Sequence, residues 1–129
     1  MNRDLKSITS AALSLGPQVR TASANGSSVD LRGFDSAVVT VAFGAYTDGT
    51  HTPSLEESND GSTFTAVAAG KLNGAFAVVN SAGGANSVQQ VGYIGGQRYV
   101  RVVMTVSGTT SGAASTAIVT RGHPAQQPA

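Results

Sequence analysis

The segment RYVRVVMTVSG, residues 98–108, restricts the fold more than any other part of the sequence. From Tyr99 to Val106, one of its two alternating sets mixes polar and apolar residues, whereas the other is entirely apolar: Val100, Val102, Met104 and Val106. Successive side chains of a β-strand point to opposite faces, so this period of two predicts a strand with one buried face.

Short runs of the same kind recur along the chain, with turn residues roughly every eight to twelve positions. We expect strands near residues 36–43, 54–58, 63–69, 75–80, 88–94, 98–108 and 115–122. Residues 36–43, SAVVTVAF, are apolar at most positions of both alternating sets, which predicts burial on both sides. Residues 44–53, GAYTDGTHTP, contain Asp48-Gly49 and are predicted to form a loop.

Short strands without an intervening helical pattern are typical of two-layer or closed β architectures. The sequence therefore predicts an all-β fold, an antiparallel β-sandwich or barrel of about eight strands. Jelly-roll-like and immunoglobulin-like strand orders remain open, because periodicity does not report topology. We expect three segments: an N-terminal arm over 1–17, the β-sandwich domain over 18–122, and a polar C-terminal tail over 123–129.

The N-terminal arm differs from the rest of the chain. Leu5, Ile8, Ala12 and Leu15 are spaced three to four apart, as on one face of a short helix, and Gly16-Pro17 would end it. Serine and threonine interrupt the pattern, so an extended arm is the alternative. The apolar stretch is short and polar-interrupted, so we do not expect a secretion signal.

The acidic segment SLEESNDGSTFTAV, residues 54–67, could be an active site, a metal site or a turn. Glu56 and Glu57 are adjacent, so on a strand they point to opposite faces and cannot act on one substrate atom. Asn59-Asp60-Gly61 is a turn sequence. We therefore predict a hairpin with solvated glutamates, and with Leu55 and Phe64 toward the buried face.

Composition argues against several other functions. The chain has no cysteine, which excludes disulfides and thiolate chemistry, and its two histidines, His51 and His123, lack a recognisable metal-ligand pattern. A net charge of +1 provides no field for nucleic acid or an anionic membrane. No run reaches the roughly 18 apolar residues of a membrane span. We expect no enzyme activity, no metal and no cofactor.

Two stretches resemble a known family. The run TDGTHTPSLEESNDGSTFTAVAA, followed by VGYIGGQRYVRVVMTVSG, resembles the capsid decoration, or cement, proteins of siphophages and phage-like gene transfer agents. DLKS followed by PQVRTASANG is similar in style to their N-termini. The resemblance covers most of the chain, roughly residues 4–123, through its overall pattern.

The resemblance implies a virion protein on the capsid exterior, made in the bacterial host cytoplasm. Such a protein bridges neighbouring copies of the major capsid protein and associates with copies of itself as a trimer or dimer. Only 12% of residues are charged, which is compatible with a surface covered by partners. The predicted contact residues lie in the arm and in the 47–53 loop: Leu5, Ile8, Leu13, Leu15, Thr47, Asp48, His51 and Pro53.

Two alternatives remain at this stage. One is another virion subunit, from the tail tube, the head–tail joint or a fibre. The other is a carbohydrate-binding module, because a DG turn before an aromatic and a later RYVRV also occur in discoidin-like sandwiches. Aromatic residues are 5% and tryptophan is absent, whereas sugar sites rely on aromatic faces.

Overall fold

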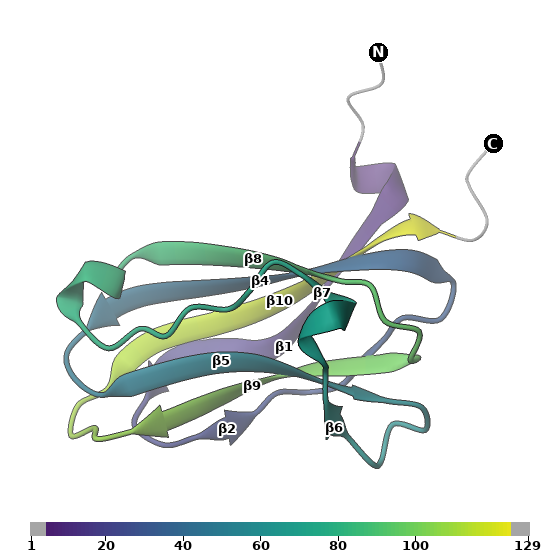
Figure 1. Cartoon of the computed structure of the whole chain (residues 1–129). Coiled ribbons are helices and arrows are strands. Elements are labelled where there is room, and N and C mark those ends of the chain that lie inside the picture. The colour runs from purple at the N-terminus through teal and green to yellow at the C-terminus, as the bar shows by residue number, and fades with distance from the viewer. Residues whose placement is uncertain (1–4, 125–129) are drawn as a thin grey trace.

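The computed structural model describes residues 5–124 as two packed antiparallel sheets, so the predicted all-β sandwich is confirmed (Figure 1). One sheet has the order β1-β10-β4-β8-β7, and in the other β2 and β3 pair with β9, followed by β5 and β6. The strand bounds are β1 Thr9–Arg20, β2 Ala24–Asn25, β3 Val29–Asp30, β4 Phe34–Tyr46, β5 Thr50–Ser58, β6 Thr65–Ala66, β7 Leu72–Asn73, β8 Ser87–Tyr93, β9 Tyr99–Ser107 and β10 Ala113–Pro124. Three short 3-10 turns complete the described chain: η1 Lys6–Ile8, η2 Ala69–Lys71 and η3 Ala82–Gly84.

The strand order is that of a jelly roll. If β2 and β3 count as one strand and the short β7 is set aside, eight principal strands remain within the described residues. The first, eighth, third and sixth form one sheet, and the second, seventh, fourth and fifth form the other. Two interleaved Greek keys give this order, so the topology that the sequence left open is decided by long-range pairing.

The core lies between the two sheets and is built mainly from valine. Its fully buried apolar side chains come from β4, β9 and β10: Val39, Val41, Val100, Val102, Met104, Ala117 and Val119. The period-two prediction for residues 98–108 is confirmed, because the apolar set faces this core. On β4 only one set is buried, since Val38, Thr40 and Ala42 face outward and are half-exposed. The expectation of burial on both sides of this strand is therefore wrong.

Residues 9–17 belong to the sheet and do not form a separate arm. β1 pairs with β10 from Thr9 to Arg20, and Leu15 is 3% exposed in the core. The predicted boundary after residue 17 falls inside this strand, and β10 extends through His123 to Pro124. The periodic apolar residues looked helical because bulges after Leu13 and Leu15 shift the alternation of the strand. Residues 1–4 and 125–129 of the predicted arm and tail lie outside the described residues.

Two predicted elements differ from the structure. The 44–53 segment contains only a short turn, because β4 continues to Tyr46 and β5 begins at Thr50. The strand expected over 75–80 is absent from the described chain, and Val79 alone forms an isolated bridge with His51. Val79 is 4% exposed in the core and Phe76 packs against the core, so this connection between β7 and β8 is held by buried side chains and not by strand pairing.

The predicted hairpin around Asn59-Asp60-Gly61 is present, with β5 paired to β6 at Glu56 and Glu57. Leu55 is buried as expected, but Phe64 is only half-buried and lies under the Arg101 guanidinium, 4.2 Å from ring centroid to Cζ. Glu57 is 7% exposed, so the prediction of a solvated side chain is wrong for this residue. It points inward because it alternates with the outward Glu56.

Candidate docking surfaces

A terminal groove lies where the chain enters and leaves the sandwich. η1 and the end of β10 project from the same end of the molecule (Figure 1). Between them is a groove of about 310 Å³, and the residues that line this terminal groove are Leu5, Ile8, Thr9, Ser36, Ala37, Val38, Thr120, Gly122 and His123. Leu5 is 68% exposed and Ile8 is half-buried, so both predicted contact residues are at an accessible apolar surface.

Side-chain contacts fix the strand ends that form the terminal groove. Arg121 donates from Nη1 to the Asp30 carbonyl (3.0 Å) and from Nη2 to the Ser10 hydroxyl (2.7 Å). Its guanidinium also lies 5.1 Å from the centroid of the Phe34 ring. On the groove side, the Ser36 hydroxyl and His123 Nδ1 are 2.6 Å apart. The groove is therefore a defined surface of the folded chain.

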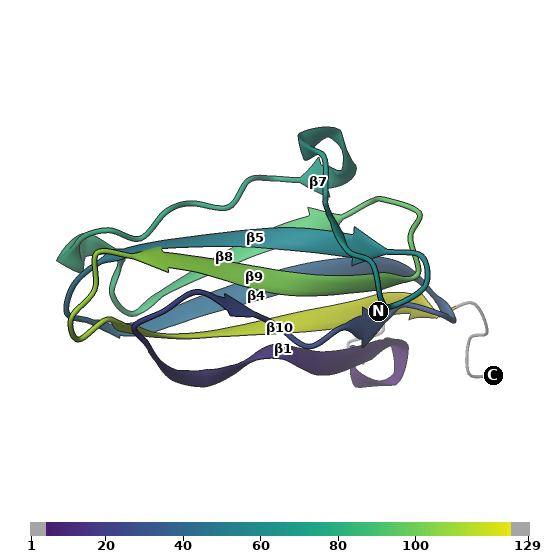
Figure 2. The same cartoon turned by 90° about the horizontal axis from the view of Figure 1, so that it is seen from below.

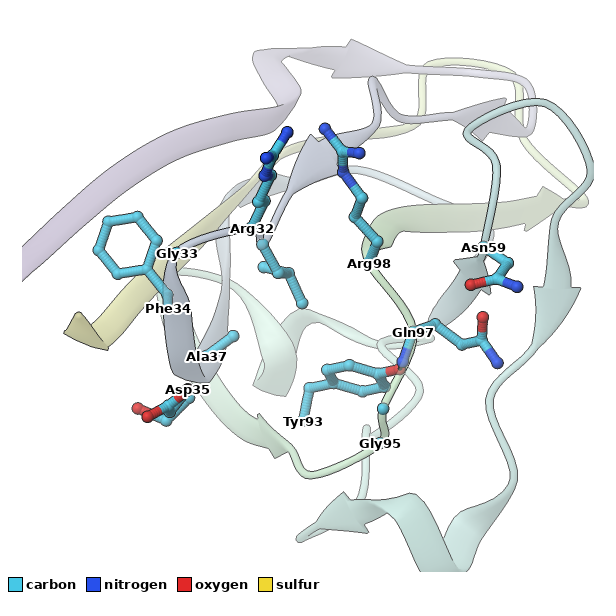
Figure 3. Close-up of a pocket in the computed structure, with 13 residues that line it drawn as sticks. Arg32, Gly33, Phe34, Asp35, Ala37, Asn59, Tyr93, Gly95, Gln97 and Arg98 are labelled. Atoms are coloured by element: carbon cyan, nitrogen blue, oxygen red, sulfur yellow. Dashed lines mark hydrogen bonds between the residues drawn. The ribbon is translucent and has the colours of Figure 1, made fainter. Parts of the chain in front are cut away.

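A second, more polar groove of about 490 Å³ adjoins the terminal groove and shares Ser36 and Ala37 with it. We call it the loop groove. Its labelled residues come from the β3–β4 connection and the start of β4, from the end of β8 and its loop into β9, and from Asn59 (Figure 3). The complete lining is Leu31–Ala37, Asn59, Tyr93 and Gly95–Arg98. Phe34 and Tyr93 are its aromatic residues.

Two polar side chains of the loop groove, Arg98 and Tyr93, are held by hydrogen bonds within the chain. Arg98 donates two hydrogen bonds to the Asp30 carboxylate, at 2.9 and 2.8 Å, and this lowers the pKa of Asp30 to about 2. The Tyr93 hydroxyl donates to Glu57 Oε1 at 2.7 Å and accepts from the Gln97 backbone N–H at 3.1 Å. Burial and the bond to Glu57 raise the pKa of Tyr93 to about 12, so the phenol remains protonated at neutral pH.

The structure separates Leu13 from Leu15. Leu13 is 54% exposed and faces outward from β1, whereas Leu15 is 3% exposed and packs in the core. Leu13 is therefore available to a partner. Leu15 is not, because the bulge between the two residues turns its side chain inward.

The predicted contact loop at 47–53 also contains both exposed and buried residues. Thr47 is exposed, but His51 is 0% exposed and Pro53 is buried, so these two are wrong as contact residues. His51 Nε2 donates to the Asp48 carbonyl at 3.0 Å, and its ring lies edge-on to Phe43. Both residues face inward because β5 begins earlier than the sequence indicated.

Asp48 holds two loops together. Its carboxylate accepts backbone N–H groups of residues 110–112, including Gly112 N at 2.7 Å from Oδ1. The Gly112 N–H, followed by those of Ser111 and Thr110, lowers the pKa of the carboxyl. Asp48 thus joins the β4–β5 turn to the β9–β10 loop and has few free acceptor positions for a partner.

Within residues 5–124, no three His, Asp or Glu side chains lie close enough to hold a metal ion. In the same part of the chain, no helix is long and apolar enough to cross a membrane.

No protein-family model and no curated protein matches this chain. Among solved structures, the chain is similar to the PBSX exported protein XepA, with a TM-score of 0.55 and 18% identity over 93% of this chain and 39% of XepA. It therefore spans well under half the length of XepA. A second solved structure, the SPBc2 prophage-derived protein YomS, has a TM-score of 0.48 and 14% identity over 87% of this chain and 92% of YomS. The similarity to XepA shows a shared fold.

Sequence reasoning identified Leu5, Ile8 and Leu13 as accessible apolar residues but missed the surfaces around them. Ser36, Thr120 and Gly122 line the terminal groove, although β4 and β10 are far apart in sequence. A signal was present, since Val38, Thr40, Ile118 and Thr120 leave the second face of two strands uncharged. Their strand pairing was needed to see that they form one surface.

Proposed function

We propose that this chain is a structural protein of a phage virion that binds the capsid exterior and bridges neighbouring copies of the major capsid protein. The observation that supports this most directly is the terminal groove, where Leu5, 68% exposed, stands beside an accessible sheet surface. The phage-derived structural neighbours, with XepA at a TM-score of 0.55, support a phage-encoded protein. The decoration-protein resemblance gives the capsid as the partner.

The geometry is compatible with a bridge between subunits. The terminal groove and the loop groove lie on either side of Ser36 and Ala37, so two capsid segments could occupy adjoining surfaces. The first is mostly apolar, whereas the second contains arginine, amide and tyrosine groups. An apolar anchor beside a polar region is the usual composition of a protein–protein interface.

Stabilisation would follow from mass action. A protein that binds the assembled lattice and not its dissociated subunits lowers the free energy of the lattice by RT ln(1 + [L]/Kd), about 2.7 kcal/mol per site at a hundredfold excess over Kd. No covalent or catalytic step is required, and we propose none. The stabilisation from many bound chains would add up over the lattice, because each chain would span a boundary between capsid subunits.

Sedimentation with capsids assembled without this protein tests the proposal. The wild-type chain should co-sediment saturably and raise the temperature at which the heads dissociate. The paired substitution Leu5→Asp and Ile8→Asp should weaken binding at least tenfold, because two carboxylates would enter an apolar contact. Deleting residues 1–16 is unsuitable, since it would remove most of β1 and the buried Leu15; residues 1–8 are the proper truncation.

Val19→Asp is the matched control. Val19 is 61% exposed on β1, like Leu5 a large exposed apolar residue, but it does not line the terminal groove. Binding by Val19→Asp should match that of the wild type. The proposal fails if wild-type chain does not bind heads, or if immunogold labelling places it on tails or fibres. Saturable binding to a glycan array instead of capsids would favour the carbohydrate-binding alternative.

A further inference from the structure

The outer face of the β1-β10-β4-β8 sheet carries aligned, uncharged side chains. Leu13, Ile118, Thr40 and Gln90 are successive Cα partners, so they form one row across four strands. Val38 and Val88 lie two positions away on the same side. Leu13 is 54% exposed and Val88 66% exposed, which shows that this outer face is open in the single chain. We call these six residues the outer-face patch.

The opposite outer face of the sandwich has a different composition. Glu56 and Arg101 form an ion pair there, with 2.7 Å between Arg101 Nη2 and Glu56 Oε1. Asp30 and Arg98 form another at 2.8 Å. The charged side chains on this opposite face are thus paired within one chain and accessible to water, whereas the outer-face patch contains no charged side chain. Depletion of charge is the compositional feature of interface centres.

The edges of the patch-bearing sheet are unsuited to strand addition. At one edge, β1 contains Pro17 and two register shifts, and proline and bulges interrupt the hydrogen-bonding groups that an added strand needs. At the other edge, β7 covers the end of β8, and the Gln89 side chain bonds the backbone N–H and C=O of Ala77 at 2.9 and 2.8 Å. If this sheet associates with another chain, we therefore expect contact through its outer face and not through an edge strand.

We infer that two copies of this chain pair through the outer-face patch, packing sheet against sheet about a twofold axis. A twofold interface places the same patch on both sides, so charged residues near the axis would meet their own kind. An uncharged patch avoids that repulsion. It also offers threonine, glutamine and valine side chains of moderate size, which suit the roughly 10 Å spacing of packed sheets.

The outer face of the β1-β10-β4-β8 sheet, which contains the outer-face patch, is large enough for a reversible dimer. Four strands about 4.8 Å apart, each contributing about eight residues of 3.3 Å, span a plane of roughly 500 Å². A pair would bury roughly 1,000 Å² in total, near the lower limit of specific interfaces. We therefore expect association in the micromolar range. The patch shares Val38 with the terminal groove, so pairing would cover part of that groove. η1 itself lies at the end of the sheet (Figure 2).

Sedimentation equilibrium over about 1 to 500 µM protein tests the inference, a range that spans micromolar dissociation constants. The mass should rise from the 12.9 kDa of one chain toward twice that value. Gln90→Glu changes an exposed amide into a carboxylate of the same shape. Combined with Val88→Glu, it should raise the dissociation constant at least tenfold, while circular dichroism shows an unchanged fold.

Thr105→Glu is the matched control, because Thr105 is exposed toward the C-terminal end of β9 on the opposite outer face. It should leave dimerisation unchanged. A wild-type mass of 12.9 kDa at the highest concentration would overturn the inference, as would a trimer or an equal effect of Thr105→Glu.

The inference goes beyond capsid binding and can be separated from it. Leu5 and Ile8 lie outside the outer-face patch, so a twofold pair would still carry two copies of this apolar contact, which would assist bridging. The Val88→Glu and Gln90→Glu chain should still bind capsids through Leu5 and Ile8, although as single copies. Loss of the dimer with capsid binding retained supports both statements, whereas a dimer that does not bind capsids refutes only the proposed function.

Discussion

Replacing Tyr93 by phenylalanine tests a buried polar link between the two sheets. Tyr93 lies on β8 and is 4% exposed, and its hydroxyl donates to the Glu57 carboxylate on β5 at 2.7 Å. Lys71 Nζ lies 3.4 Å from the second oxygen of Glu57. The hydroxyl also accepts the Gln97 backbone N–H at 3.1 Å, so one oxygen organises both a buried acid and the β8–β9 loop.

The expected loss can be worked out from these contacts. A hydrogen bond to a charged group contributes about 1.5–3 kcal/mol, and leaving the Gln97 N–H without its acceptor costs about 1 kcal/mol. Phenylalanine retains the apolar ring, so no cavity term is added. The free energy of unfolding should fall by about 2–4 kcal/mol, a large part of the 5–15 kcal/mol typical of a domain.

Urea unfolding, followed by circular dichroism, measures this change. With a slope of about 1.5 kcal/mol/M, the midpoint should move down by about 2 M while the slope stays constant. Tyr99→Phe is the control, because within residues 5–124 its hydroxyl makes no hydrogen bond; it should cost less than about 0.5 kcal/mol. A loss for Tyr93→Phe within 0.5 kcal/mol of that control would refute the reasoning.

A double-mutant cycle isolates the link itself. Glu57→Gln and Tyr93→Phe should each destabilise, and the double variant should lose less than their sum by about 1–2 kcal/mol, because both remove the same contact. Additive effects would show that the hydroxyl and the carboxylate act independently. In that case the two sheets are held together at this end by apolar packing alone.

Two further predictions concern the core and the β5–β6 turn. Leu15→Ala should lower the free energy of unfolding by about 2–5 kcal/mol and Leu13→Ala by less than about 1 kcal/mol in thermal or urea unfolding, because only the first side chain is buried; equal losses would contradict the placement of β1. The backbone N–H groups of Thr63 and Ser62 lower the pKa of Asp60 to about 2. Its stabilising contribution is therefore complete above the unfolded pKa of about 3.9 and lost as pH falls toward 2, so the melting-temperature advantage over Asp60→Asn should shrink across that range. An advantage independent of pH would show that this carboxylate does not stabilise the turn.

The fold class could be predicted because it depends on local alternation. Residues 98–108 keep a period of two and form a strand with the expected face buried, and residues 88–94 contain most of β8, as predicted. The strand prediction was wrong where bulges interrupt the alternation or where an apolar run has no strand partner. The pattern of β1 predicted an arm because the bulges after Leu13 and Leu15 break its period. Residues 75–80 do not form the predicted strand, because an apolar run does not by itself specify a pairing partner.

The candidate site was predictable in part for the same reason. Leu5, Ile8 and Leu13 could be singled out as apolar residues near the N-terminus, and all three are at least partly exposed. His51 and Pro53 were misplaced, because the short turn after Tyr46 cannot be distinguished by composition from a longer loop. Their burial depends on where β5 meets β9 and Val79.

The sequence by itself determined that this chain forms short strands with one apolar face, turns at residues such as Asp48-Gly49 and Asn59-Asp60-Gly61, and a lightly charged surface. Tertiary structure alone decided the jelly-roll order, the joining of β1 to β10 and the burial of Glu57. It also brought Leu13, Ile118, Thr40 and Gln90 into one row. The physical reason is that side-chain alternation is encoded residue by residue, whereas strand partners are selected by packing between segments that can be far apart in sequence, as Thr9 and Gly122 are.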